Sequence, residues 1–490
     1  MQVFLRKIKV IGLLLWVLVA CSGQEAPPTP LASPPSLEST PTYAPATAPG
    51  LEGVGVAGGR SIGDPYTPEL GNTGYDVQQY TLQLALDPAV EVIVGKVTID
   101  AIATVSNLTQ ISLDFVGFDI EQVTVAALPV LFTRVDGKLI VPLSRPLAQG
   151  ESFAVTVTYE GTPVKKLSPY VGFAEALGLH FVNNETIYVL SEPDGARYWF
   201  PCNDHPRDKA TFRFELTVPE GLTAVANGRL LDVPDGVSQP LPDGDPGHTF
   251  VWEHNYPMAT YLAVAAVAEY ERIEDVSPGG VLLRHYTYPE VRDEFETAVA
   301  ITGEAIDWMS DLFGLYPFEA FGYVTADVPG ASVETQTMVL LSANMIGRRT
   351  VIHELAHMWF GDWVSLESWS EMWRNEGFAT YVTLMWEHRD DPEELELEIE
   401  GIRAAVAENE PHYPLGNPPP ERLFGFNTYF GGALLVHALR EEVGDEAFFA
   451  GLRDYFQRYG GGTASDAEFQ AVMEEAAGRS LDAFFTEWLN

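Results

Sequence analysis

The chain has 490 residues, which is long enough for two or three domains with ample core, and nearly half of the residues are apolar. Its formal net charge of −41 excludes nucleic acid as a partner, because nucleic-acid binding rests on cationic contacts to phosphate. Such acidity can attract cationic substrates or metal ions, but it equally suits a salty or hot habitat, so charge alone selects no function.

The first element in chain order is a targeting segment over residues 1–20. A cationic start is followed by the apolar stretch "VIGLLLWVLVA", which is too short for a comfortable membrane helix. The sequence "LVAC" then resembles a bacterial lipobox, in which Cys21 is lipidated and becomes the mature N-terminus. The alternative is an ordinary cleaved signal followed by an accidental cysteine. We favour the lipoprotein, which places the protein outside the cytoplasm, at the bacterial cell surface or in the periplasm, with membrane contact through the lipid anchor only.

Residues 21–66 follow as a segment rich in Pro, Ala, Ser and Thr. This composition cannot bury enough apolar surface to fold, and proline keeps the chain extended. We therefore predict a disordered tether that lifts a folded body off the membrane. If Cys21 is acylated, Cys202 is the only cysteine left, so no intrachain disulfide can form.

Residues 67–275 are expected to form an antiparallel β domain. Short runs alternate apolar and polar residues between turn residues, as in "YTLQLALD", "SFAVTVTYEG" and "FRFELTVP". This period of two is typical of strands that bury one face.

Residues 276–490 change to helical periodicity. The pattern predicts one long amphipathic helix over 292–314 and a strand-like piece at 321–328. Further helices are expected around 345–362, 370–388, 392–410, 427–443, 445–459 and 465–475. The fold class is therefore α+β multidomain, with the β domain first and a mainly α domain after it.

The stretch "VIHELAHMWFGDWVS" contains two histidines four residues apart, His353 and His357. On a helix they share one face about one turn apart, so both imidazoles can reach a single ion. Glu354 lies between them, which completes the HExxH arrangement of two zinc ligands and a carboxylate general base. The alternative is a surface helix with incidental histidines. The apolar flanks argue against it, because they indicate a buried helix in which an unpaired glutamate would be costly.

A catalytic zinc needs three protein ligands and one open position. Glu376 lies nineteen positions after His357, in the next predicted helix, and the intervening segment is long enough to reverse the chain direction. We therefore predict one Zn²⁺ per chain held by His353, His357 and Glu376, although another divalent ion can replace zinc in vitro. Water would take the fourth position and Glu354 would accept its proton, so the expected chemistry is hydrolysis of an amide.

Several stretches, in the same order along the chain, resemble the aminopeptidase N family of gluzincin metallopeptidases, which includes leukotriene hydrolase. In chain order they are "EPDGARYWFPCNDHPRDKATF", "YPMATYLAVAAVAEY", the HExxH segment with "EMWRNEGFATY" after it, and "NTYFGGALLVHALR". The resemblance covers roughly residues 75–490 and suggests a two-domain bacterial lipoprotein form. It implies a saddle-like N-terminal β domain followed by a thermolysin-like, mainly α catalytic domain.

The resemblance implies roles for further residues. Tyr429 matches the family's tyrosine that hydrogen-bonds the developing oxyanion; the alternative is a tyrosine packed on a helix face. Glu334 occupies the register of the glutamate in the family's "GAMEN" motif, which anchors the substrate's α-amino group, although only that glutamate of the motif is retained. Glu192 either shares this amine-binding task or forms a structural salt bridge with Arg197, and the sequence leaves both open.

The resemblance thus implies a zinc-dependent aminopeptidase that hydrolyses peptides with a free N-terminus. A gluzincin endopeptidase is the second possibility and requires that Glu334 binds no amine. A non-catalytic surface scaffold that kept the fold is the third, but pseudoenzymes usually lose the base or a ligand, and none is lost here. The family commonly carries a C-terminal helical domain over the active site, and its absence from this sequence leads us to expect a more open site.

Overall fold

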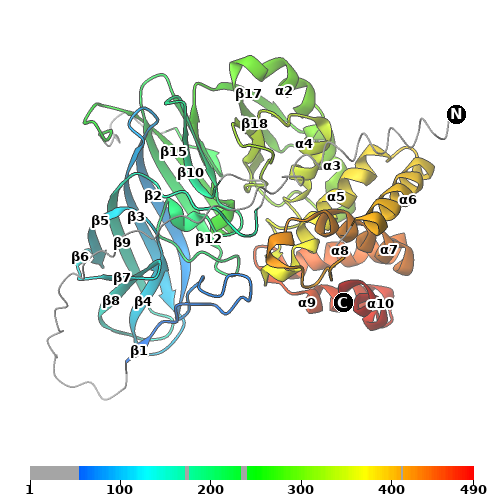
Figure 1. Ribbon diagram of the computed structural model, residues 1–490, viewed down its shortest axis with the longest axis horizontal. Helices are drawn as coiled ribbons and strands as arrows, with labels where there is room; N and C mark the ends of the chain where they lie inside the picture. Colours follow the sequence, from blue (N-terminus) through cyan, green and yellow to red (C-terminus); the bar gives the residue numbers. More distant parts are fainter. Residues whose placement is uncertain (1–54, 172–175, 233–239, 410–411) are drawn as a thin grey trace, which may run out of the picture.

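The computed structural model describes residues 55–171, 176–232, 240–409 and 412–490. The targeting segment, Cys21 and most of the predicted tether lie outside these residues. Among the helices in the described ranges, none is both long and apolar enough to cross a membrane. Figure 1 shows a β-rich N-terminal half beside a half that is formed mainly by helices.

An eight-stranded sheet dominates the N-terminal half, with the strand order β14-β15-β12-β2-β3-β9-β5-β6. In chain order its strands are β2 (Tyr75–Asp87), β3 (Val92–Ala103), β5 (Asp119–Val125), β6 (Leu128–Pro129), β9 (Ser152–Gly161), β12 (Ala210–Val218), β14 (Arg229–Leu230) and β15 (His248–Met258). The predicted alternation is clear in β3, where every second residue from Ile93 to Ala103 is buried.

The eight-stranded sheet of the predicted antiparallel β domain contains one parallel pair at its centre, because β12 runs parallel to β2. The other pairs in this sheet are antiparallel. The long chain segment between these two strands allows the parallel pairing, since only short hairpin connections force neighbouring strands to be antiparallel.

Two four-stranded sheets complete the β half. One has the order β1-β4-β8-β7, formed by β1 (Val56–Ala57), β4 (Leu108–Asp114), β8 (Lys138–Leu147) and β7 (Thr133–Val135). The other has the order β10-β11-β16-β13, formed by β10 (Gly178–Val182), β11 (Thr186–Leu190), β16 (Ala265–Ala268) and β13 (Thr223–Ala226).

The folded body begins earlier than the predicted end of the tether at residue 66. The backbone N–H of Val56 donates to the carbonyl of Asn107 at 2.8 Å, and β1 pairs with β4. Asp64 and Tyr66 are buried. Backbone pairing and these two buried side chains therefore hold a segment whose composition alone resembled a linker.

The second half contains a five-stranded sheet of β17 (Glu271–Val276), β18 (Leu282–Thr287), β20 (Tyr323–Ala326) and β21 (Val339–Ser342), with β19 (Ala320–Phe321) beside β18. Because β17 pairs with β18, the strand from Glu271 belongs to this half, a few residues before the predicted boundary at 275. The helices are α2 (Arg292–Val299), α3 (Thr302–Phe313), α4 (Arg348–Ala356), α5 (Trp373–Glu387), α6 (Pro392–Glu408), α7 (Gly432–Val443), α8 (Asp445–Tyr459), α9 (Asp466–Ala477) and α10 (Asp482–Leu489).

Two predicted helices differ from those in the structure. The single helix expected over 292–314 is interrupted between α2 and α3, where the hydroxyl of Thr302 donates to the carbonyl of Val299 at 2.6 Å and competes with the helical bond. The helix expected over 345–362 is shorter, because α4 ends at Ala356 and His357 is its C-cap. Its last turn is tightened by a 3.1 Å bond from Met358 N to Leu355 O.

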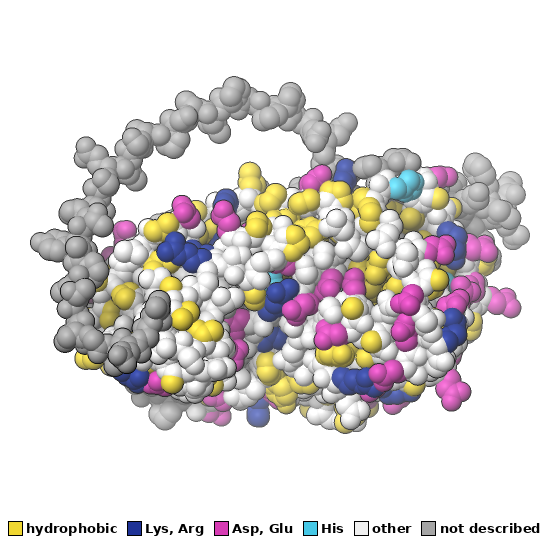
Figure 2. Space-filling view, turned by 90° about the horizontal axis from the view of Figure 1, so that it is seen from below, with side chains coloured by type: hydrophobic (Ala, Val, Ile, Leu, Met, Phe, Trp, Pro, Cys, Tyr) yellow, Lys and Arg dark blue, Asp and Glu magenta, His cyan; other side chains and the backbone are white. Residues whose placement is uncertain are grey.

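Polar bonds join the two halves along their boundary. Lys209 donates from Nζ to the carbonyl of Asp362 at 2.7 Å, and Arg207 donates from Nε to the carbonyl of Glu367 at 2.6 Å. Trp369, from the helical half, packs in the same apolar cluster as the β half. On the face shown in Figure 2, acidic side chains are most frequent over the helical half.

Candidate active site

The helix α4 and the residue after it supply the two histidines. Val351, Ile352, Leu355 and Ala356 bury one side of α4 in the core, which holds the opposite side toward the boundary between the halves. The side chain of His353 is 19% exposed and that of His357 is 1% exposed, so His353 is the more accessible of the two histidines.

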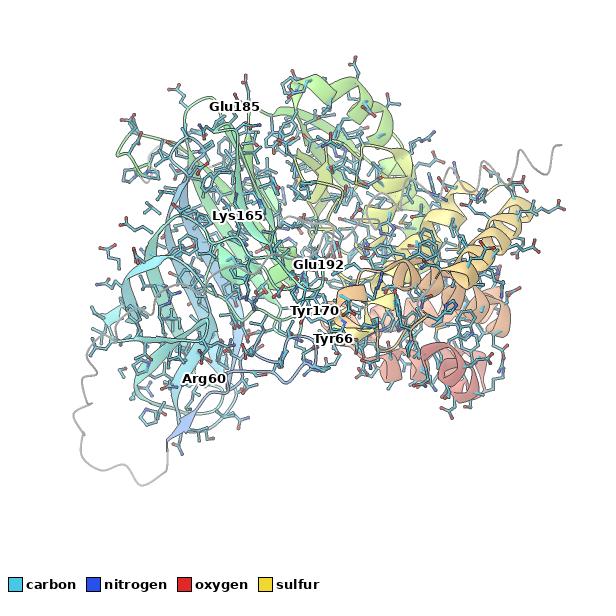
Figure 3. All side chains as sticks on the ribbon, in the orientation of Figure 1. Arg60, Tyr66, Lys165, Tyr170, Glu185 and Glu192 are labelled. Carbon is cyan, nitrogen blue, oxygen red and sulfur yellow. The ribbon has the colours of Figure 1, made fainter. Side chains whose placement is uncertain are left out.

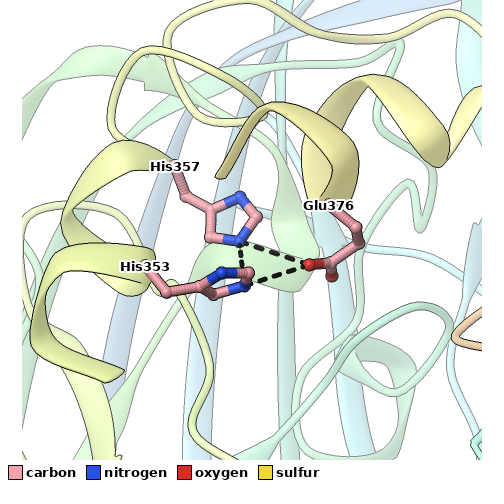
Figure 4. A group of neighbouring side chains, drawn as sticks. All are labelled: His353, His357 and Glu376. Carbon is pink, nitrogen blue, oxygen red and sulfur yellow. Dashed lines mark hydrogen bonds and ion pairs between the residues drawn. The ribbon is translucent and has the colours of Figure 1, made fainter. Parts of the chain in front are cut away.

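Glu376 comes from helix α5, which is buried from Trp373 to Trp386 and packs against α4. Its Oε2 lies 3.2 Å from His353 Nε2 and 3.6 Å from His357 Nε2, and the two Nε2 atoms are 3.3 Å apart (Figure 4). Ligands about 2.0–2.1 Å from a tetrahedral zinc are separated by roughly 3.3 Å. The three atoms therefore have the mutual spacing that one zinc ion requires.

The electrostatics of this triad also fit a cation. Burial raises the pKa of Glu376, but bonds from His353 and His357 outweigh burial and lower it to about 2. Burial lowers the pKa of His357, but Glu334, Glu376 and Glu354 outweigh burial and raise it to about 10. The surrounding carboxylates thus stabilise positive charge at the point where the ligand atoms meet.

Glu354 is buried beside the triad. One of its carboxylate oxygens lies within 4.8 Å of ligand atoms of Glu334 and His357. Burial raises its pKa well above the ordinary carboxyl value, although the charge of His357 opposes the shift. The structure therefore places a proton-accepting carboxylate next to the predicted metal position.

Glu192 and Glu334 form a second carboxylate pair at the same centre. Glu192 follows β11, and Glu334 precedes β21 by a short turn. Their oxygens and one of Glu376 all lie within 4.8 Å of one another. Burial and the neighbouring Glu334 raise the pKa of Glu192 well above its usual value. Figure 3 shows Glu192 at the boundary between the two halves.

The alternative that Glu192 is a structural partner of Arg197 does not hold. The guanidinium of Arg197 pairs instead with Asp194, with Nη2 at 2.7 Å from Oδ2. Glu192 Oε1 and Glu334 Oε1 are both buried without a hydrogen-bond partner. Unpaired buried carboxylate oxygens are costly, and these two atoms are available to accept hydrogen bonds from a cationic group.

Tyr429 lies in a π-helical turn, Asn427–Gly431, that leads into α7. Its ring stacks on the ring of His353, with centroids 6.0 Å apart and an interplanar angle of 18°. The structure thus brings Tyr429 to the accessible edge of the triad, together with the other residues that the sequence singled out there.

Arg374 holds the start of α5 in place through its guanidinium group. Its guanidinium donates to Asp466 at 2.7 Å, to Tyr455 at 2.8 Å and to the carbonyl of Ala464 at 2.6 Å, and it also pairs with Glu371. These bonds fix the first turn of α5, two residues before Glu376. Sequence alone could not identify three of these four acceptors, because Tyr455, Ala464 and Asp466 lie 81 to 92 residues away along the chain.

Two family models match this chain. The Peptidase M1 N-terminal domain matches residues 76–262, and the Peptidase family M1 domain matches residues 318–488. Human Aminopeptidase N is 32% identical over 355 residues, 66% of this chain and 36% of that protein. Rice Aminopeptidase M1-B is 30% identical over 322 residues, 61% of this chain and 36% of that protein. The chain therefore spans about a third of the length of these curated relatives.

The matching solved structures cover a larger part of this chain and nearly all of their own length. The M1 zinc metallopeptidase from Deinococcus radiodurans is 31% identical with a TM-score of 0.80, covering 88% of this chain and 97% of that chain. A variant of that enzyme bound to a Tyr-Ser-Ala substrate matches equally well. A variant of a two-domain M1 zinc metallopeptidase bound to L-tryptophan is 30% identical with a TM-score of 0.79, covering 88% of this chain and 98% of that chain.

Proposed function

The chain belongs to peptidase family M1, as its motifs suggested, and we propose that it is a zinc-dependent aminopeptidase that removes N-terminal residues from peptides. The two-domain fold of the family, a β-rich N-terminal domain and a helical catalytic domain, is the predicted one. The observation that carries the proposed specificity is the pair of unpartnered oxygens on Glu192 and Glu334, beside the donor triad.

His353, His357 and Glu376 would hold the zinc ion. When bound, zinc polarises a carbonyl group and lowers the pKa of a water molecule. The second ring nitrogen of His357, Nδ1, donates to the backbone carbonyl of Phe360 at 3.1 Å. That bond orients the ring and leaves Nε2 free to act as a ligand.

Glu354 is proposed to accept the proton of the attacking water at its carboxylate. A general base works best when its pKa lies near the working pH. Burial moves the pKa of Glu354 in that direction from the ordinary carboxyl range. The same carboxyl group can then deliver the proton to the leaving amine, because the buried side chain of Glu354 keeps the proton inside the site.

Tyr429 is proposed to donate its hydroxyl hydrogen bond to the oxygen that becomes negative during hydrolysis. Its stacking on the ring of His353 holds it beside the metal ligands. A donor placed for the developing oxyanion contributes roughly 10²- to 10³-fold to kcat.

The free amino group of the substrate distinguishes an aminopeptidase from an endopeptidase. An ammonium group placed between Glu192 and Glu334 would pair with both unpartnered oxygens and offset their mutual repulsion. The substrate of an endopeptidase would place a neutral peptide group at this position. Neither its carbonyl nor its N–H would neutralise two carboxylates. The carboxylate pair therefore favours exopeptidase specificity.

The proposals for membrane anchoring and cellular location rest on the sequence. We propose lipid anchoring through Cys21 and a location at the bacterial surface or in the periplasm, supported by the lipobox-like "LVAC" and the Pro-rich segment after it. The substrates would be peptides with a free N-terminus. Tyr, Trp and Arg substrates are the first to test, because structures of family members contain Tyr-Ser-Ala, L-tryptophan and L-arginine.

The test uses the purified protein and a panel of aminoacyl chromogenic amides, each beside its N-acetylated twin, with and without a zinc chelator. Chelator-sensitive cleavage of the free-amine series alone supports the proposal. Equal cleavage of the acetylated twins points to an endopeptidase. Zinc binding without cleavage of any peptide substrate points to the scaffold.

A further inference from the structure

The carboxylate of Glu334 is carried by a tight, buried turn. Val333 and Leu340 pair across its base through two backbone bonds of 2.9 and 3.0 Å. At its tip Met338 N donates to Thr335 O at 3.1 Å. The turn extends beyond β21 toward the β half, so its position depends on its contacts with residues of the β half.

Asn227, between β13 and β14 of the β half, meets this turn directly. Its Nδ2 donates to the carbonyl of Gln336 at 2.7 Å and to the carbonyl of Leu262 at 2.9 Å. Its Oδ1 accepts from Val264 N at 2.7 Å. The side chain is completely buried, so all three bonds form away from water and fix the turn to the β half.

The neighbouring residues add a second contact. Thr337 has a φ of +66°, a left-handed conformation that a β-branched residue rarely adopts. Its Oγ1 accepts a hydrogen bond from Gly228 N at 2.9 Å. Gly228 itself has a φ of +84°, and a Cβ there would lie 2.1 Å from the carbonyl oxygen of Glu253. The β half thus holds a strained residue three positions after Glu334.

Two further bonds complete the setting of the turn. Gln336 Nε2 donates to His254 Nε2 on β15 at 2.8 Å, and burial lowers the pKa of His254 to about 3, so its ring is a neutral acceptor. On the other side, Thr337 N approaches Met358 Sδ at 3.4 Å, one residue after the metal ligand His357. The turn is therefore held between the β half and the metal-binding segment.

We propose that Asn227, together with the Gly228–Thr337 contact, positions Glu334 for the substrate's amino group, so that the β domain sets amine recognition in the catalytic domain. This inference rests on the proposed aminopeptidase function. Asn227 is a positioning residue: it touches no reacting atom, and it acts by fixing the backbone from which the Glu334 carboxylate extends. An ammonium group requires that carboxylate at hydrogen-bond distance, and a displacement of about 1 Å can cost up to 10²-fold in rate.

The test compares Asn227→Ala with Asn72→Ala. Asn72 is also a buried amide of the β domain, and it donates to Asp114 at 2.8 Å and to Asn203 at 3.1 Å, within that domain. For each protein we would measure zinc content, thermal stability, kcat and KM, and the Ki ratio of an amino-acid hydroxamate to its des-amino counterpart. Asn227→Ala should lower kcat/KM roughly 10- to 100-fold, mainly through KM, and reduce the amine-dependent Ki ratio with zinc unchanged. Asn72→Ala should lower stability and leave the Ki ratio unchanged.

A second pair keeps the test decisive if Asn227→Ala does not fold. Thr337→Val removes the hydroxyl acceptor at nearly constant shape, and Thr337→Ser retains it. Loss of the Ki ratio in Thr337→Val with recovery in Thr337→Ser supports the positioning role. A wild-type Ki ratio in the folded variants overturns it, even if stability falls. A wild-type enzyme that shows no preference for the free amine overturns the proposed function itself, which separates the two failures.

Discussion

His357 donates from Nδ1 to the backbone carbonyl of Phe360 across 3.1 Å. A carbonyl oxygen can only accept, so when the ring is neutral its proton lies on Nδ1, and Nε2, which lies 3.6 Å from Oε2 of Glu376, carries the lone pair. A single bond made just beyond the end of α4 therefore selects the tautomer that can bind a metal.

Glu354→Gln should retain zinc and lose turnover. The amide occupies nearly the same volume and leaves the three ligands intact, but it cannot accept a proton. We expect kcat to fall by roughly 10²- to 10⁴-fold, measured beside the zinc content of the same preparation. Glu446→Gln, an exposed position on α8, is the control and should behave as wild type. Near-normal turnover in Glu354→Gln would refute the proposed mechanism.

Glu334→Ala should impair recognition of the substrate's amino group. Removing one of two buried carboxylates leaves the ammonium with a single partner, and a charge-assisted hydrogen bond contributes about 1.5–3 kcal/mol. We expect a higher KM and a kcat/KM lower by roughly 10- to 100-fold for free-amine substrates. A des-amino competitive inhibitor should bind as in wild type. An unchanged kcat/KM would rule out amine anchoring by Glu334.

Removal of the metal should lower both activity and stability. Without an ion, four buried carboxylates and two histidines face one another and must be compensated by protons. At free zinc 100-fold above Kd, binding contributes about 2.7 kcal/mol to the stability of the folded state. Chelation should therefore lower the Tm and abolish turnover, and added zinc should restore both. Glu376→Gln should bind zinc more weakly. Full activity after verified zinc removal would contradict the assignment of the metal centre.

Arg374→Leu should destabilise the fold strongly. The substitution leaves Glu371 and Asp466 without the guanidinium that lies between them. Breaking a buried ion pair by removing one partner costs about 3–5 kcal/mol. Urea unfolding at neutral pH would measure the loss. The matched control is Arg458→Leu, since Arg458 makes ion pairs at the surface and its removal should cause no resolvable change. Equal stability of both variants would show that the Arg374 network contributes little.

Asp64 should make stability depend on pH in the acid range. Burial raises its pKa, but the neighbouring His205 imidazole, 3.3 Å away, and bonds from backbone N–H groups outweigh burial and lower it from 3.8 to about 2. A carboxyl with a depressed pKa stabilises the fold above its unfolded pKa, and this contribution disappears as pH falls from about 4 to about 2. The shift corresponds to about 2 kcal/mol. Asp64→Asn should lack this part of the pH dependence of the unfolding free energy, and the same slope in both proteins would contradict the role of Asp64.

The sequence by itself determined what depends on local spacing. Because of the helical repeat, an interval of four residues places His353 and His357 on the same face. Because a strand is pleated, the alternating residues of β3 point to opposite faces of the sheet. The family resemblance rested on short contiguous motifs, and the matches over residues 76–262 and 318–488 confirmed it. Such features involve residues that are close along the chain, so their geometry can be inferred without knowing the fold.

Only the tertiary structure decided how distant segments meet. It brought Glu192 to face Glu334, placed Arg374 against Asp466, and ran β12 parallel to β2. It also brought Asn227 to the turn that carries Glu334, over more than a hundred residues of chain. These contacts depend on how the two halves pack, and a period or a short motif contains no information about a partner so far away in sequence.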